Sequence, residues 1–113
     1  MKTWITQLVL LTSVLFSLPL WAASFDCQSA VSTDEKTICL THQLNDQDVE
    51  MSVKYHFLKG LLPMGEQGDM ADTQRIWLKK RQACGSDVGC LTEQYQQRIS
   101  QLDKLYTSIN KPL

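Results

Sequence analysis

Four cysteines are the most reactive side chains of this 113-residue chain, and they come in two pairs. Cys27 and Cys39 form the first pair, and Cys84 and Cys90 form the second. Four thiols allow three disulfide connectivities. We favour local pairing, because the second pair brackets residues 85–89, a turn where the end of one helix and the start of the next come close enough for a disulfide.

Zinc binding is the alternative chemistry for Cys39, since His42 follows it at helical i, i+3 spacing. A structural zinc site takes four ligands, typically from two such short-range pairs. The sequence offers a single pair of this kind, so we favour disulfides over a metal. We expect neither a metal nor another cofactor.

Adjacent carboxylates at Asp34 and Glu35 are the nearest approach to an acid–base pair. Neighbouring positions on a helix point apart, and both residues suit a helix start, because Ser32 and Glu35 match the S-x-x-E capping box. His42 and His56 have no nucleophile placed beside them by a motif. The sequence has no Gly-rich phosphate loop, H-E-x-x-H or G-x-S-x-G. We therefore predict a protein without catalytic residues.

One helical stripe carries an arginine and a tryptophan, at i, i+3, i+4, i+7 and i+10. Its members are Gln74, Trp77, Leu78, Arg81 and Cys84. It is either a binding face or a framework in which Trp77 packs in the core and Arg81 reaches a carboxylate or a helix end. We favour the framework. Arg98 follows Tyr95 by three residues, and Asp48 is a candidate buried partner for either arginine.

Contact residues for a partner are expected in loops, because rigid scaffolds present function there. The longest predicted loop is Gly60–Ala71, with Leu62, Met64, Glu66 and Asp69 as candidate contacts. The second is the predicted stapled turn 85–89, with Ser86 and Asp87. The simpler interpretation of both segments is an ordinary connection between helices.

Glycine and proline divide the chain at residues 60–68 and 85–89. A short helix is predicted near residues 32–40, with a break near 42–45. A long helix is then predicted from Leu44 to Leu62, because the residues of its mostly apolar stripe are alternately four and three positions apart. Val49, Val53 and Phe57 are expected to widen this stripe. The next helix is predicted to start at residue 69 or 72 and the last to span residues 91–109. The fold expected is an all-α, disulfide-stapled bundle of three to four helices.

Residues 1–23 predict a secretory signal peptide. Lys2 is their single charge, an apolar run from Leu8 to Leu18 follows, and Pro19 precedes the small residues Ala22 and Ala23. An uncleaved anchor is the less favoured alternative. We expect residues 24–113 to be the folded domain, periplasmic or secreted, with no stable membrane anchor after cleavage.

Composition excludes several functional classes. The net charge of −1 and the mixed 20% of charged residues argue against nucleic-acid binding. A 43% hydrophobic content argues against disorder. Removal of the signal leaves about 90 residues. A domain of this size buries only roughly 60–65% of the surface that its unfolded chain exposes, so we expect disulfide bonds to stabilise it.

The pattern of the mature region resembles the LprI-type lysozyme inhibitor family. Its first half matches the family at Cys27, Glu35, Ile38, Cys39, Leu44, Asp48, Met51 and Tyr55. Its second half matches Q-x-x-W-L-x-x-R-x-x-C at 74–84 and C-L-x-x-x-Y-x-x-R-I at 90–99. Gln47 departs from the family pattern, which has an apolar residue before Asp48.

The resemblance implies a helical domain with two disulfides and, for some members, inhibition of lysozyme. The function expected is binding of lysozyme and occlusion of its active-site cleft by a protein without chemistry of its own. The alternative is a non-inhibitory periplasmic structural or interaction module with an unknown protein partner, and a small hydrolase is a third hypothesis.

Overall fold

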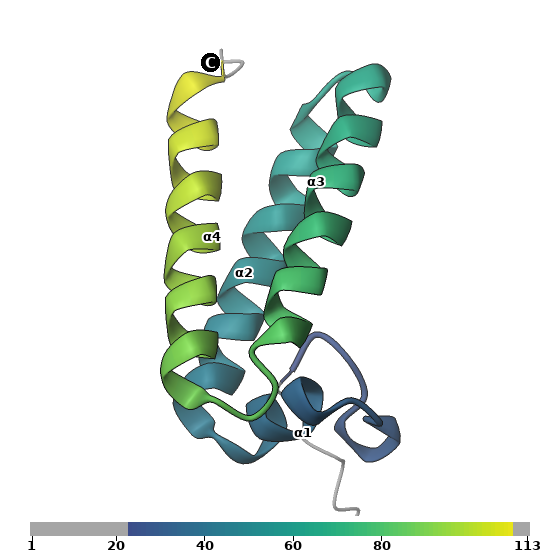
Figure 1. The fold of residues 1–113 in the computed structure, drawn as a ribbon. Helices are drawn as coiled ribbons and strands as arrows, with labels where there is room; N and C mark the ends of the chain where they lie inside the picture. Colours follow the sequence, from purple (N-terminus) through teal and green to yellow (C-terminus); the bar gives the residue numbers. More distant parts are fainter. Residues whose placement is uncertain (1–22, 110–113) are drawn as a thin grey trace, which may run out of the picture.

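The computed structural model describes residues 23–109, and these residues are helical in almost their whole length. A 3₁₀-helix, η1 (Cys27–Ser29), precedes α1 (Thr33–Leu40), α2 (His42–Leu61), α3 (Met64–Ala83) and α4 (Val88–Ser108). The three long helices lie side by side, and α1 crosses one end of them (Figure 1). The all-α bundle predicted from the sequence is confirmed.

The predicted signal peptide lies outside the described residues except for Ala23, which is buried. Among residues 23–109, no helix is both long enough and apolar enough to cross a membrane.

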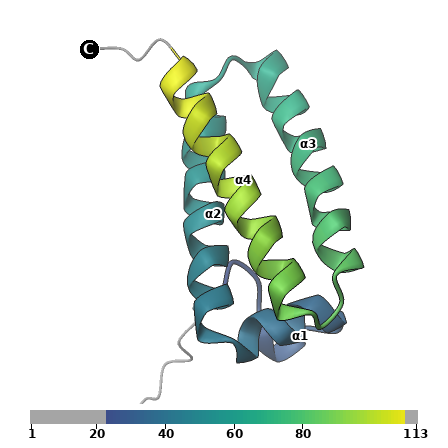
Figure 2. The same ribbon diagram turned by 60° about the vertical axis from the view of Figure 1, so that its left-hand side comes forward.

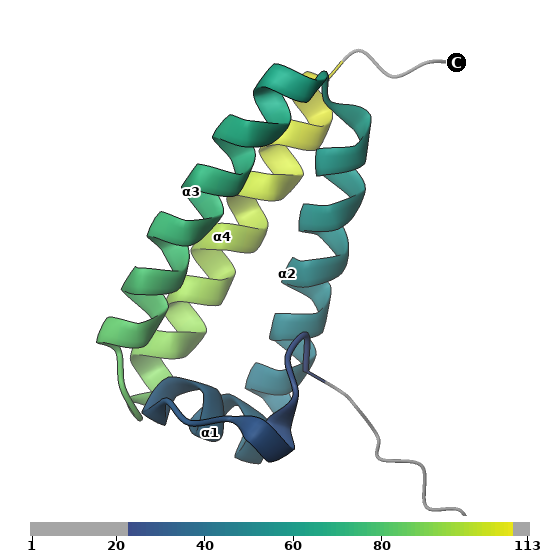
Figure 3. The same cartoon turned by 90° about the vertical axis from the view of Figure 1, so that its right-hand side faces the viewer.

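The long helices alternate in direction, so the bundle has two different ends. The start of α2, the end of α3 and the start of α4 meet over α1 (Figures 2 and 3). We call this the stapled end, because Cys27, Cys39, Cys84 and Cys90 belong to it. At the opposite end, the connection Leu62–Pro63 lies near the end of α4 (Figure 2), and we call this the open end.

Both disulfides join cysteines that are near in sequence, as predicted. Cys27 and Cys39 have Cα atoms 5.8 Å apart, and Cys84 and Cys90 have Cα atoms 5.6 Å apart. Cys39 is therefore not available as a thiolate ligand beside His42. Among the described residues, no group of three or more His, Cys, Asp or Glu is arranged to hold a metal ion.

The core is formed by the residues that the helical spacing selects. Its buried members are Ile38, Leu44, Met51, Tyr55, Leu58, Met70, Trp77, Leu91, Tyr95 and Leu102. The predicted widening of the α2 stripe is wrong: Val53 is 63% and Phe57 is 58% exposed. Because only two long helices cover α2, one face of it stays in solvent, and Val49 lies on that exposed side.

Helix α3 begins at Met64, not at residue 69 or 72 as predicted. The expected long loop Gly60–Ala71 is thus almost entirely helical, and only Leu62 and Pro63 connect α2 to α3. The glycines that suggested a loop are tolerated because the helix start is supported locally. Glu66 lies in the first turn, where a carboxylate is favourable. The side-chain amide of Gln67 donates to the carbonyl oxygen of Leu62 over 2.9 Å.

The start of α1 also differs from the prediction. Ser32 is the N-cap residue, but its side chain makes no capping hydrogen bond, so the S-x-x-E box does not form. The break after α1 is the single residue Thr41, just before the predicted break at 42–45. Asp34 is turned inward and is 1% exposed. Its role is therefore not that of a surface carboxylate at a helix start.

Candidate functional site

A buried ion pair joins α1 to α3. Nε of Arg81 donates to Oδ2 of Asp34 over 2.8 Å, and the two side chains are 5% and 1% exposed. Burial by itself raises the pKa of Asp34, but the neighbouring Ser32 hydroxyl and the Arg81 guanidinium bring the pKa below its ordinary value. The carboxylate therefore stays ionised inside the protein.

Asp48 is the second carboxylate of this cluster and is fully buried. The Tyr95 hydroxyl donates to its Oδ1 over 2.7 Å, and the backbone N–H of Ser24 donates to its Oδ2 over 2.7 Å. Nη1 of Arg81 lies 3.7 Å from the same Oδ1. Burial, together with the charge of Asp48, raises the pKa of the Tyr95 phenol. We call these groups the Arg81 network: Asp34, Asp48, Arg81 and Tyr95.

Aromatic rings enclose the Arg81 guanidinium. Its central carbon lies 5.4 Å from the Phe25 ring centroid and 5.9 Å from that of Trp77. The Trp77 ring packs edge-on to Tyr95 at 5.2 Å, and its Nε1 donates to the carbonyl oxygen of Gln94 over 3.1 Å. Every strong donor and acceptor in this cluster is thus directed inward. The geometry is that of a framework holding α1 and the N-terminal segment against the bundle, rather than of an exposed binding face.

Arg98 is buried without a carboxylate. Its Nε donates to Oε1 of Gln74 over 3.0 Å and its Nη1 to Oε1 of Gln101 over 3.3 Å. Its Nη2 is buried and has no hydrogen-bond partner among the described residues. Burial lowers the pKa of Arg98. Of its two candidate partners, Asp48 therefore lies beside Arg81 alone. Arg98 donates instead to the neutral side-chain amides of Gln74 and Gln101.

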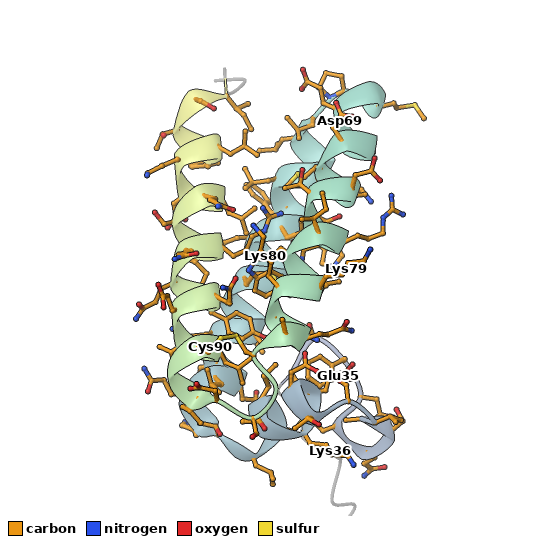
Figure 4. The ribbon with its side chains drawn as sticks, viewed as in Figure 1. Glu35, Lys36, Asp69, Lys79, Lys80 and Cys90 are labelled. Atoms are coloured by element: carbon orange, nitrogen blue, oxygen red, sulfur yellow. A yellow bond between two sulfur atoms is a disulfide. The ribbon has the colours of Figure 1, made fainter. Side chains whose placement is uncertain are left out.

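Two further residues of the predicted framework line a shallow hollow near α1. Glu35 and Leu78 are half-buried there, beside the buried ring of Tyr55. Figure 4 labels Glu35 and Cys90 toward the stapled end, with Asp69 at the far, open end.

A large groove lies at the open end, between the first half of α3 and the second half of α4. Its volume is about 810 Å³. Three predicted contact residues line it, namely Leu62, Glu66 and Asp69. Met64 does not line it but is 87% exposed at the start of α3. The remaining lining residues are Leu61, Pro63, Met70, Thr73, Arg98, Gln101, Leu102, Leu105, Ser108 and Ile109.

The other two predicted contact residues lie at the stapled end. Ser86 and Asp87 are exposed there and do not line the groove, whose nearest residues, Thr73 on α3 and Arg98 on α4, lie about ten helical residues away, or roughly 15 Å. Asp87 also has a structural role, because its Oδ1 accepts a hydrogen bond from the backbone N–H of Cys90 and so caps α4. The two predicted contact segments therefore do not form one surface.

Sequence reasoning missed two features of these sites. Asp34 precedes buried Ile38 by one helical turn, so the helical period itself placed it on the inward face. The α4 side of the groove, which includes Gln101 and Leu105, was treated only as part of a core stripe. Gln101 and Leu105 line a groove because α3 lies beside α4, and nothing in the sequence indicated how these two helices are placed.

Comparison with protein families identifies the relatives of this chain. The family model described as lysozyme inhibitor LprI matches residues 26–102. The chain belongs to the LprI lysozyme inhibitor family. The matched region contains both disulfides, the Arg81 network and most of the open-end groove. Neither a search of curated proteins nor one of solved structures gives a significant match.

Proposed function

We propose that this LprI family protein is exported, binds lysozyme and occludes its active-site cleft with the open end of the bundle. The observation that carries the proposal is the grouping of Leu62, Glu66 and Asp69 in one groove. These residues combine an apolar contact with two exposed carboxylates. Family membership supplies the class of target.

Charge complementarity supports this choice of surface. Lysozymes are usually basic, and complementary charge at an interface raises the rate of association and sets its orientation. Glu66 and Asp69 lie one helical turn apart on α3 and both face the groove. A partner that covers the cleft withholds the two catalytic carboxylates of lysozyme from the polysaccharide, and this needs no chemistry in the inhibitor.

Rigidity also suits an inhibitor of this kind. Two disulfides and the Arg81 network fix the helices before any partner arrives. A pre-organised surface loses less conformational entropy on binding than a flexible one. Export is supported by the signal-like residues 1–23 and by the disulfides, which persist in oxidising compartments.

Cell-wall lysis assays with c-, g- and i-type lysozymes test the proposal. The oxidised protein in micromolar excess is expected to slow lysis by at least one type. The double substitution Glu66→Lys/Asp69→Lys is expected to weaken inhibition at least about tenfold. The matched control is Asp46→Lys/Glu93→Lys, which reverses two exposed acids away from the groove and leaves inhibition unchanged. Absence of inhibition with all three types rejects the proposal.

The alternative function is a non-inhibitory interaction module of the cell envelope. The exposed apolar residues Val53 and Phe57 on α2 favour it, because they offer a contact surface away from the groove. Pull-down from periplasmic extract separates the two functions. A partner that is lost with Val53→Ser/Phe57→Ser, but not with the Glu66/Asp69 reversal, supports the module. Recovery of lysozyme, lost only with the reversal, supports the inhibitor.

A further inference from the structure

Arg98 stands out in the open-end groove because its positive charge is not compensated. The side chain is 4% exposed, and none of the carboxylates in residues 23–109 forms an ion pair with it. Its Nε and Nη1 donate hydrogen bonds to neutral side-chain amides, and its Nη2 has no acceptor among the described residues. Buried charges in proteins are ordinarily paired. Arg81 follows this rule, since it has two carboxylates beside it.

The groove around Arg98 has the dimensions of a ligand site. Its volume of about 810 Å³ lies within the range of small-molecule and peptide pockets. Met70 and Leu102, which are buried, and the half-buried Leu105 give it apolar walls. Glu66 and Asp69 also line it but remain exposed and make no ion pair with Arg98. One buried positive group thus lies among apolar side chains, with two negative groups exposed to solvent.

We infer that the groove binds the C-terminal residue of a peptide, with its carboxylate on the Arg98 guanidinium and its apolar side chain against Met70, Leu102 and Leu105. A carboxylate supplies both the missing acceptor and the missing negative charge. A C-terminal apolar residue brings carboxylate and hydrocarbon together on one residue, which matches the placing of Arg98 among apolar walls. Glu66 and Asp69 repel a polyanion, and they favour a basic residue preceding the terminus.

The inference does not rest on lysozyme inhibition, since its ligand and its test involve no lysozyme, although both ligands use the same groove. Two probe peptides that differ in a single group decide it. The first is acetyl-Lys-Leu-Leu with a free carboxylate, and the second is the same tripeptide as the carboxamide. Titration into ¹⁵N- and methyl-labelled oxidised protein, followed by NMR, gives the affinity and the position of binding. The free acid is expected to shift the signals of Met70, Leu102 and Leu105 and to bind at least about tenfold more tightly than the amide.

Variants then assign the preference to Arg98. Arg98→Met keeps the aliphatic length of the side chain, removes its charge, and is expected to abolish the difference between acid and amide. Arg75→Met is the matched control: Arg75 is 71% exposed and pairs with Asp72, so its loss leaves the preference unchanged. Thr73→Trp, an exposed position that lines the groove, is expected to weaken binding of both peptides at least about fivefold by filling space.

Several outcomes overturn the inference. Equal binding of acid and amide, no binding of either peptide, or shifts confined to residues outside the groove each rejects it. A preference that persists in Arg98→Met also rejects it. Should Arg98→Met fail to fold, the acid–amide comparison in the wild type and the weaker binding of both peptides to Thr73→Trp decide the question.

Discussion

Asp34 and Arg81, which are 47 residues apart in the sequence, form an ion pair of 2.8 Å with almost no exposure to solvent. The pair joins an eight-residue helix to one of the long helices. A helix shorter than about 12 residues is marginal in isolation, so α1 depends on tertiary contacts for its existence. The Cys27–Cys39 disulfide and the burial of Ile38 in the core also hold this part of the chain in place.

Removal of one partner of this pair is expected to destabilise the protein strongly. Asp34→Ala leaves the Arg81 charge buried with only the more distant Asp48, and such losses cost about 3–5 kcal/mol. Asp72→Ala is the control, because its ion pair with Arg75 is exposed and is worth under about 1 kcal/mol. Urea unfolding monitored by far-UV circular dichroism measures both values. Equal losses for the two variants would contradict a special role of the buried pair.

Acid is expected to remove the contribution of Asp34. Burial raises the pKa of this group, but Ser32 and Arg81 lower it by more, so its folded pKa lies below the unfolded value of 3.8. The unfolded chain therefore binds the proton first as the pH falls. The stabilisation is complete above the unfolded pKa and is lost as the pH falls through the lower, folded pKa.

Thermal unfolding of the wild type and of Asp34→Asn, measured from about pH 6 to about pH 2, tests this sign. The wild type is expected to lose melting temperature more steeply than the variant below the unfolded pKa of 3.8. The two curves should converge at the acid end, where Asp34 is protonated. Parallel curves throughout the range would show that Asp34 does not control acid stability.

Asp48→Ala is expected to lower the melting temperature without changing affinity for a partner. Asp48 is fully buried and accepts hydrogen bonds from Tyr95 and from the backbone of Ser24, so its loss leaves the buried Tyr95 hydroxyl without its acceptor and removes a partly buried bond to the N-terminal segment. The Glu66→Lys/Asp69→Lys variant should behave in the opposite way, with weaker lysozyme binding and little change in melting. Unchanged melting combined with weakened binding in Asp48→Ala would refute the framework role.

The two disulfides are expected to differ in their contribution. In the chain-entropy model, the shorter Cys84–Cys90 loop stabilises by about 2 kcal/mol and the longer Cys27–Cys39 loop by about 3 kcal/mol. Paired Cys→Ser substitutions at each site, compared by urea unfolding, measure the difference. Loss of Cys27–Cys39 should also release α1, which would appear as faster amide exchange at Ile38. A larger loss for Cys84–Cys90 would run against the loop-length argument.

Helix type and the inward face of each helix follow from residue order. The 4 and 3 spacing of Leu44, Met51, Tyr55 and Leu58 selects one side of α2, and all four side chains are buried. Local disulfide pairing was likewise predictable, because a short turn separates Cys84 from Cys90. Where local rules compete, prediction was less successful. The glycines near residue 65 suggested a loop, yet the first-turn carboxylate of Glu66 and the hydrogen bond from Gln67 to the Leu62 carbonyl oxygen support a helix from Met64 onward.

Only the tertiary structure decided what the inward-facing polar residues contact. Two arginines, Arg81 and Arg98, stand at similar positions in their motifs, and periodicity places both inside. The packing of α1 against α3 brings Asp34 to Arg81, whereas no carboxylate of the described residues pairs with Arg98. Spacing along one helix fixes a direction for each side chain, but the partner across the interface depends on how separate helices pack. That packing leaves Arg98 as the uncompensated charge in the open-end groove.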